Sequence, residues 1–243
     1  MAEAFAWGIF ASSSLVVGAL IALTFRIGVR TLGMVMAFGS GVLISAVAYE
    51  LAQEAFDTAG GSGYAAGGLF AGSLAFFAGD LLIARMGGSD RKRSDGGQSG
   101  GTALAIVLGI VLDGVPESMV IGLSLLAGEG VSAAVIVAVF LSNLPESVAA
   151  TTGLVASGWS RGRIFGLWAL VAAVGGLAAL AGYALLDGAS PGTLAFVLAF
   201  AGGAILTMLA DTMMPEAFEH GGRAVGLFTT VGFAVAFAVS ALD

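Results

Sequence analysis

The sequence has no cysteine and only one histidine among its 243 residues, and only 10% of its residues are charged. The absence of cysteine excludes disulfides, thiolate metal sites and thiol redox chemistry. Because 58% of the residues are hydrophobic and the mean hydropathy is +1.01, too little polar surface exists to cover a soluble globule of this size. The nine Lys and Arg residues lie at the ends of apolar stretches, so no nucleic-acid partner is expected. The composition predicts an integral membrane protein whose surroundings are the lipid bilayer.

The apolar stretches run for about 20 residues without the alternation of barrel strands, which favours membrane-spanning helices. The 39 glycines allow such helices to approach closely, and they permit a homodimer without requiring one. We therefore predict an all-α integral membrane protein with eight transmembrane helices in one transmembrane domain, residues 1–243. The predicted spans are roughly 4–25, 31–55, 64–85, 102–127, 131–157, 163–186, 192–214 and 223–242.

A charged segment rich in glycine and serine separates the first three spans from the other five, and residues 86–101 are predicted to form a flexible cytoplasmic loop. In an eight-span arrangement all nine basic residues fall on one side of the membrane. The positive-inside rule places that side in the cytoplasm and both termini outside, in a multi-pass protein of the plasma (inner) membrane. The basic residues are Arg26, Arg30, Arg85, Arg91, Lys92, Arg93, Arg161, Arg163 and Arg223.

An internal repeat links the second and seventh predicted spans. The segment that starts at Gly41 aligns without gaps with the segment that starts at Gly203, and residues 54–56 and 216–218 are both Glu-Ala-Phe. Because the two spans cross in opposite directions, the copies have inverted topology. Inverted repeats with a site near the bilayer midplane are typical of secondary transporters. We predict a 3+2+3 arrangement, in which helices 1–3 and 6–8 form the inverted repeat around a central helix 4/5 pair.

The central pair carries two motifs that place a Pro-Glu dipeptide inside an apolar stretch. The motifs are Leu-Asp-Gly-Val-Pro-Glu-Ser at residues 112–118 and Leu-Ser-Asn-Leu-Pro-Glu-Ser at residues 141–147. A proline inside a helix removes a backbone hydrogen bond, and a carboxylate deep in hydrocarbon is energetically costly. Pro116 and Pro145 should also free the carbonyls of Leu112 and Leu141 as oxygen ligands or water sites. Two such motifs in consecutive spans indicate one paired site.

The polar residues of each motif are spaced to share one helix face. Four residues separate Asp113 from Glu117 and Ser142 from Glu146, and Asn143 lies three residues before Glu146. Since the short connection makes the two spans antiparallel neighbours, the faces are expected to meet and form an oxygen-rich cluster that a cation neutralises. Two alternatives stay open, namely protonated carboxyls that only hydrogen-bond in helix packing and carboxyls that transfer protons.

The eight-span layout, the outside termini, the inverted repeat and the two Pro-Glu motifs resemble the ZIP (Zrt/Irt-like) family of divalent-metal transporters over essentially the whole chain. In that family span four usually carries His-Asn-x-Pro-Glu-Gly and span five His-Glu-x-Pro-Glu-Gly, and these residues form the metal site of the transport pathway. The resemblance implies a single transporter domain, not an enzyme, that takes up divalent metal ions as its substrate. By position it assigns Glu117 and Glu146 as metal ligands, with Asp113, Ser142 and Asn143 at the neighbouring ligand positions.

The chain departs from the family pattern at those neighbouring positions. Asp113 and Ser142 stand where the family has histidines, Asn143 replaces an acid, and Gly114 and Gly175 offer no side-chain ligand where the family has one. Imidazole suits zinc, whereas carboxylate, carbonyl and water oxygens favour harder ions. We therefore expect a single oxygen-dominated site that takes manganese, iron or another hard divalent ion and holds zinc less selectively.

Further acids lie at matching ends of the repeat. Glu50 and Glu54 are near the outer end of span two, and Asp211 and Glu216 are near the inner end of span seven. These acids are expected to line the entrance and the exit of a cation pathway, where their negative potential attracts cations, with ordinary interfacial solvation as the alternative. His220 would either bind departing metal at the cytoplasmic edge or simply be solvated there.

Two other functions compete with transport. One is an intramembrane hydrolase that uses two acids as general acid and base. Residues 79–80 are similar to the Gly-Asp of intramembrane aspartyl proteases, but the usual partner motif is absent. Asp80 would either face the exit of the pathway or pair with Arg85, and the pairing is the preferred expectation. The other is a ZIP-like protein that has lost transport and acts as a sensor or scaffold, which the missing histidines allow.

Overall fold

The computed structural model describes residues 1–242 except 61–62, 89–90, 92, 94–102 and 128–129. The described residues form helices joined by short connections, with no strand among them. The long helices are α1 (Ala2–Thr24), α2 (Val29–Ala46), α4 (Tyr64–Arg85), α5 (Ala103–Ser124), α6 (Ala133–Ala156), α7 (Arg161–Leu186), α8 (Pro191–Met208) and α10 (Val225–Ser240). The short ones are η1 (Val47–Gln53), α3 (Glu54–Thr58), η3 (Leu125–Ala127), η4 (Leu209–Met213), α9 (Met214–Gly221) and η5 (Gly222–Ala224).

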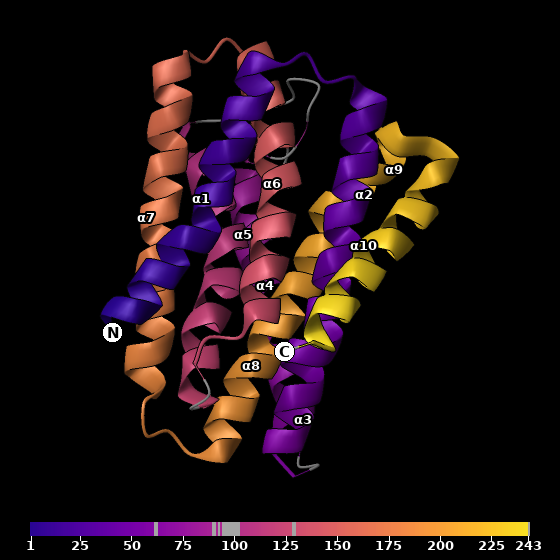
Figure 1. Ribbon diagram of the computed structural model, residues 1–243. Coiled ribbons are helices and arrows are strands. Elements are labelled where there is room, and N and C mark those ends of the chain that lie inside the picture. Colours follow the sequence, from indigo (N-terminus) through magenta and orange to yellow (C-terminus); the bar gives the residue numbers. More distant parts are fainter. Residues whose placement is uncertain (61–62, 89–90, 92, 94–102, 128–129, 243) are drawn as a thin grey trace.

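Seven helical segments of the described chain are long and apolar enough to cross a membrane, which confirms the predicted class of multi-pass helical membrane protein. The last of these segments, Pro191–Ser240, is 50 residues long and contains α8, α9 and α10. Between α9 and α10 it includes Gly222, whose φ of 63° is in the left-handed region that glycine adopts without strain. Figure 1 shows the chain turning back there, so that α10 runs beside α2.

Local sequence signals explain where several helices begin and end. Serine side chains accept hydrogen bonds from backbone N–H groups at the first turns of α6, α7 and α8, as N-caps do; these serines are Ser132, Ser160 and Ser190. Glycines with positive φ follow α4, α6 and α7, where the chain must leave the helix; they are Gly87, Gly158 and Gly188.

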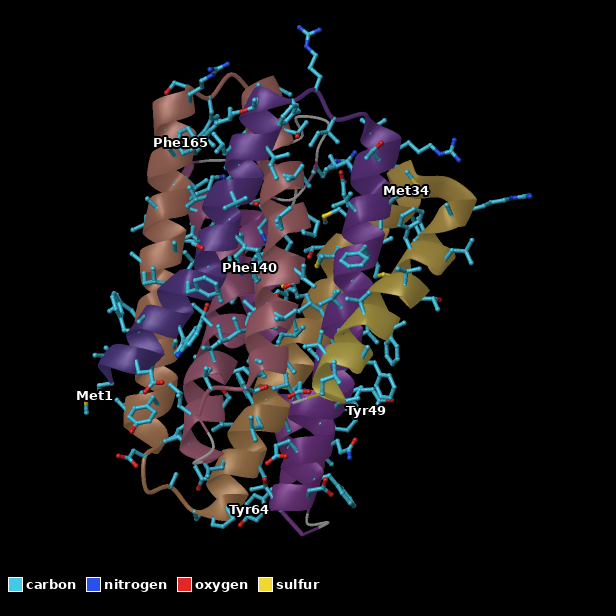
Figure 2. All side chains as sticks on the ribbon, in the orientation of Figure 1. Met1, Met34, Tyr49, Tyr64, Phe140 and Phe165 are labelled. Carbon is cyan, nitrogen blue, oxygen red and sulfur yellow. The ribbon has the colours of Figure 1, made fainter. Side chains whose placement is uncertain are left out.

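The helices α5 and α6 lie in the middle of the bundle (Figure 1). The helix α6 packs against α1 and α2, whereas α5 packs against α7 and α8, and the two also contact each other. Long nitrogen-tipped side chains extend from the end of the bundle where Met34 and Phe165 lie (Figure 2). The motif-bearing helices therefore contact helices on several sides, and the basic side chains gather at one end.

Glycines allow the closest helix contacts. A Cβ atom on Gly41 of α2 would clash with the carbonyl oxygen of Thr229 on α10. In the same way, a Cβ atom on Gly203 of α8 would clash with the carbonyl oxygen of Leu69 on α4. Close backbone approach of this kind is how membrane helices associate when hydrophobic burial gives no advantage over lipid.

We expect the Gly203→Ala variant to be destabilised by about 1–3 kcal/mol, because the added methyl group meets backbone that cannot move independently. Thermal unfolding in detergent measures the loss. Gly166→Ala is the matched control, since a Cβ atom on Gly166 in α7 would meet nothing within 4 Å. Equal melting temperatures of the two variants would contradict the packing argument.

Candidate functional site

All five residues predicted to form the site are buried in the bundle. Asp113 and Glu117 come from α5, while Ser142, Asn143 and Glu146 come from α6, and their exposed fractions range from 0% to 6%. Burying a carboxylate is costly unless a cation or hydrogen-bond donors compensate its charge. Three buried acids on two central helices therefore need compensating groups.

The two motif prolines lie inside intact helices. Neither Pro116 nor Pro145 ends its helix, so α5 and α6 continue on both sides of them. Since proline has no N–H, the carbonyls four residues earlier, at Leu112 and Leu141, lack their usual helical hydrogen bond. Space for the Pro145 ring is provided by Gly39 of α2, on which a Cβ atom would lie 2.7 Å from the proline Cγ.

Asp113 is paired with an arginine that the sequence interpretation had assigned to the cytoplasmic loop. Arg91 Nε and Nη2 each donate to a different carboxylate oxygen of Asp113 at 2.8 Å, and its Nη1 lies 2.7 Å from Oδ1 of Asp80 on α4. The arginine is only 1% exposed. Burial lowers the pKa of Arg91, but the negative charges and hydrogen bonds of Asp113 and Asp80 outweigh that effect and raise it. The expected pairing of Asp80 with Arg85 is wrong.

Asn143 and Glu146 face a small cavity. They line it together with Gly114 of α5 and Trp168 of α7, and its volume of about 10 Å³ has room for one water molecule. A Cβ atom on Gly114 would meet nothing within 4 Å, so this glycine leaves open space beside the two polar side chains. Ser142 is directed differently, because its hydroxyl donates to the carbonyl of Val139 in its own helix at 3.0 Å.

Glu117 lies beside a second cavity, together with Glu50. Both side chains line a small cavity of about 20 Å³ between α5, α6, η1 and α8. Glu50, Val120 and Val135 also line a much larger open cavity of about 750 Å³, which Glu54 lines as well. The predicted entrance acids therefore lie along a hollow that leads toward Glu117.

Hydroxyl groups surround the carboxylate of Glu50. It accepts hydrogen bonds from Ser240 at 2.5 Å and from Ser132 at 3.4 Å. These two hydroxyl groups fix the position of the Glu50 side chain at the edge of the cavity. The large cavity thus holds carboxylate and hydroxyl groups beside apolar side chains such as Val120 and Leu123.

The acids predicted at the exit are placed at the opposite end of the bundle. Glu216, Glu219 and His220 have ligand atoms within 4.8 Å of one another, and this is the only such group of three or more acids, cysteines or histidines in the described part of the chain. Nδ1 of His220 lies 3.6 Å from Oε1 of Glu216, and Glu219 pairs with Arg93 at 3.3 Å. Asp211 on η4 is exposed.

The predicted five-residue cluster is distributed over neighbouring positions. Asp113, Glu117 and Glu146 do not form a group with ligand atoms within 4.8 Å of one another. Asp113 contacts Arg91, Glu117 lines a cavity with Glu50, and Glu146 shares its cavity with Asn143. Gly175, at the position of a family ligand, packs against Ser12, and a Cβ atom there would also lie 3.0 Å from the Ser118 hydroxyl.

No protein-family model matches the chain, and no curated protein matches it. The resemblance to the ZIP family therefore depends on the sequence motifs and the predicted span layout alone.

Proposed function

We propose that this chain transports divalent metal ions across the plasma membrane as a divergent, ZIP-like carrier, with uptake as its direction. The observation that carries the proposal is the burial of Asp113, Glu117 and Glu146 on the two central helices of a membrane bundle. Intramembrane acids are rare and usually mark ion pathways. A cavity that leads from Glu54 past Glu50 toward Glu117 supports a route for the ion.

The packing supports the inverted repeat and eight crossings that the proposal includes. Gly41 on α2 packs against α10 as Gly203 on α8 packs against α4, so the second helix of each half contacts the third helix of the other half in a matching way. The π-helical segments η1 and η4 begin at Val47 and Leu209, each six residues after the corresponding glycine. In this arrangement α8 and α10 are separate crossings, and the basic end of the bundle faces the cytoplasm.

Oxygen atoms dominate the proposed site. Glu146 and Asn143, which share one cavity, are its ligands on α6, and Glu117 and Asp113 are the carboxylates on α5; no described histidine or cysteine lies among them. Such a ligand set favours manganese and iron over zinc, although zinc remains a substrate. The two halves of the repeat would move against α5 and α6 to expose this site to each side in turn.

The test is uptake into proteoliposomes that contain the purified chain, with protein-free liposomes as the control. We expect saturable uptake of Mn²⁺ and Fe²⁺ and weaker selectivity for Zn²⁺. A folded, reconstituted chain that moves none of these ions would overturn the proposal.

We also expect Glu50→Gln and Glu54→Gln to raise the KM for Mn²⁺ at low ionic strength, by about two- to tenfold for the pair, because both carboxylates line the entrance cavity. Since salt screens the attraction, the difference from the parent should shrink in high salt. Initial uptake rates at two salt concentrations measure both effects. A KM that does not depend on either substitution would show that ions enter elsewhere.

A further inference from the structure

The side chain of Arg91 connects three helical segments inside the bundle. Its guanidinium pairs with Asp113 on α5 and with Asp80 on α4, and Nη1 also lies 3.3 Å from the carbonyl oxygen of Gly88. Asp211 on η4 is close enough to interact electrostatically with both Arg91 and Asp80. One buried cation therefore lies among three acids that come from different parts of the chain.

Two glycines make room for this arginine. A Cβ atom on Gly109, one helical turn before Asp113, would clash with Cδ of Arg91 and lie 2.9 Å from its Nε. A Cβ atom on Gly88 would lie 2.8 Å from the carbonyl oxygen of Ala105 in α5. The backbone at Gly88 thus lies against α5. The Arg91 side chain occupies the space that a side chain at position 109 would need.

The arrangement leaves Asp113 with both carboxylate oxygens hydrogen-bonded to one cation, each at 2.8 Å. Arg91 thus covers one lone pair on each carboxylate oxygen of Asp113, and a metal ion on the same side of the carboxylate would have to displace it. The positive guanidinium would also repel a divalent ion bound at Glu117, one helical turn beyond Asp113. The guanidinium and a metal ion therefore compete for the negative charge of Asp113.

We propose that Arg91 is a tethered cation that competes with the transported metal ion for Asp113. This inference rests on the proposed transport function. A divalent ion, with twice the charge of the guanidinium, displaces Arg91 from Asp113, whereas a monovalent ion has no such advantage. Arg91 thereby sets the affinity of the site and its preference for divalent ions.

The experiment measures Mn²⁺ binding to the purified chain by calorimetry and by the thermal shift that Mn²⁺ produces. We expect Arg91→Met to bind Mn²⁺ about tenfold more tightly than the parent. A factor of this size is usual when two ligands, here the Arg91 guanidinium and Mn²⁺, affect each other's binding. Gly109→Ala should tighten binding in the same direction, because it displaces the arginine without changing the charge of the protein. Binding of Na⁺ should also become measurable in both variants.

Two controls separate displacement from general effects. Arg93→Met removes a positive charge two residues away, on a side chain that is 35% exposed and pairs with Glu219, and it should leave the affinity unchanged. Gly166→Ala should also leave it unchanged, since that position has open space. Where Arg91→Met does not fold, Gly109→Ala still decides the question. Parent-like affinity in both test variants would overturn this inference alone, whereas absence of Mn²⁺ binding in every protein would overturn the proposed function.

Discussion

Replacing Glu146 with alanine is expected to reduce Mn²⁺ uptake at least about a hundredfold. Glu146 lines the small cavity with Asn143 and Gly114, so its carboxylate is the principal charged ligand on α6. Mutation of a residue that merely orients a metal ligand typically lowers metal affinity or activity about ten- to a hundredfold. Loss of a ligand itself should lower them at least as much. Initial uptake rates in proteoliposomes, per folded protein, measure the effect.

The matched control for this variant is Glu3→Ala, because Glu3 is an exposed glutamate in the first turn of α1. Its uptake should equal that of the parent. The fold of the Glu146→Ala protein is checked by its melting temperature in detergent, because uptake is compared per folded protein. An unchanged uptake rate in a folded Glu146→Ala protein would exclude Glu146 as a ligand.

Replacing Asp113 with alanine is expected to lower the stability of the folded state by about 3–5 kcal/mol. The substitution removes the Asp113 carboxylate from Arg91, which stays buried and paired with Asp80. Removing one partner of a buried ion pair is more costly than removing both, because the remaining charge stays desolvated. Thermal unfolding in detergent measures the loss.

The double variant Asp113→Ala with Arg91→Met tests this explanation. It removes the buried arginine charge and should regain part of the lost stability. Double-mutant analysis of the four proteins gives the coupling between the two residues. If Asp113→Ala has the melting temperature of the parent, the pair does not stabilise the fold.

The sequence predicted the helices well because long apolar runs identify membrane spans almost independently of tertiary contacts. The span predicted at 131–157 corresponds to α6, Ala133–Ala156, and that at 163–186 to α7, Arg161–Leu186. It did not predict that helix continues between 214 and 223, because the polar residues of α9 end the apolar run. Pro215 is tolerated there because it lies in the first turn of α9.

The site was only partly predictable. The apolar setting of the motifs predicted acids inside the membrane bundle, and Asp113, Glu117 and Glu146 are buried, but their joint role in one site stays a prediction. The pairing of Asp80 with Arg85 failed because residues five positions apart point in different directions on a helix. The contact of Arg91 with Asp113 joins residues 22 positions apart in the sequence, and no periodic pattern indicates it.

The most direct measurement for the central claim is Mn²⁺ uptake by the parent chain and by the Glu117→Ala, Glu146→Ala double variant, reconstituted at equal density. We expect saturable Mn²⁺ uptake by the parent, whereas the double variant should take up no more Mn²⁺ than liposomes without protein. Equal uptake by the two folded proteins, or none by either, would contradict the central claim.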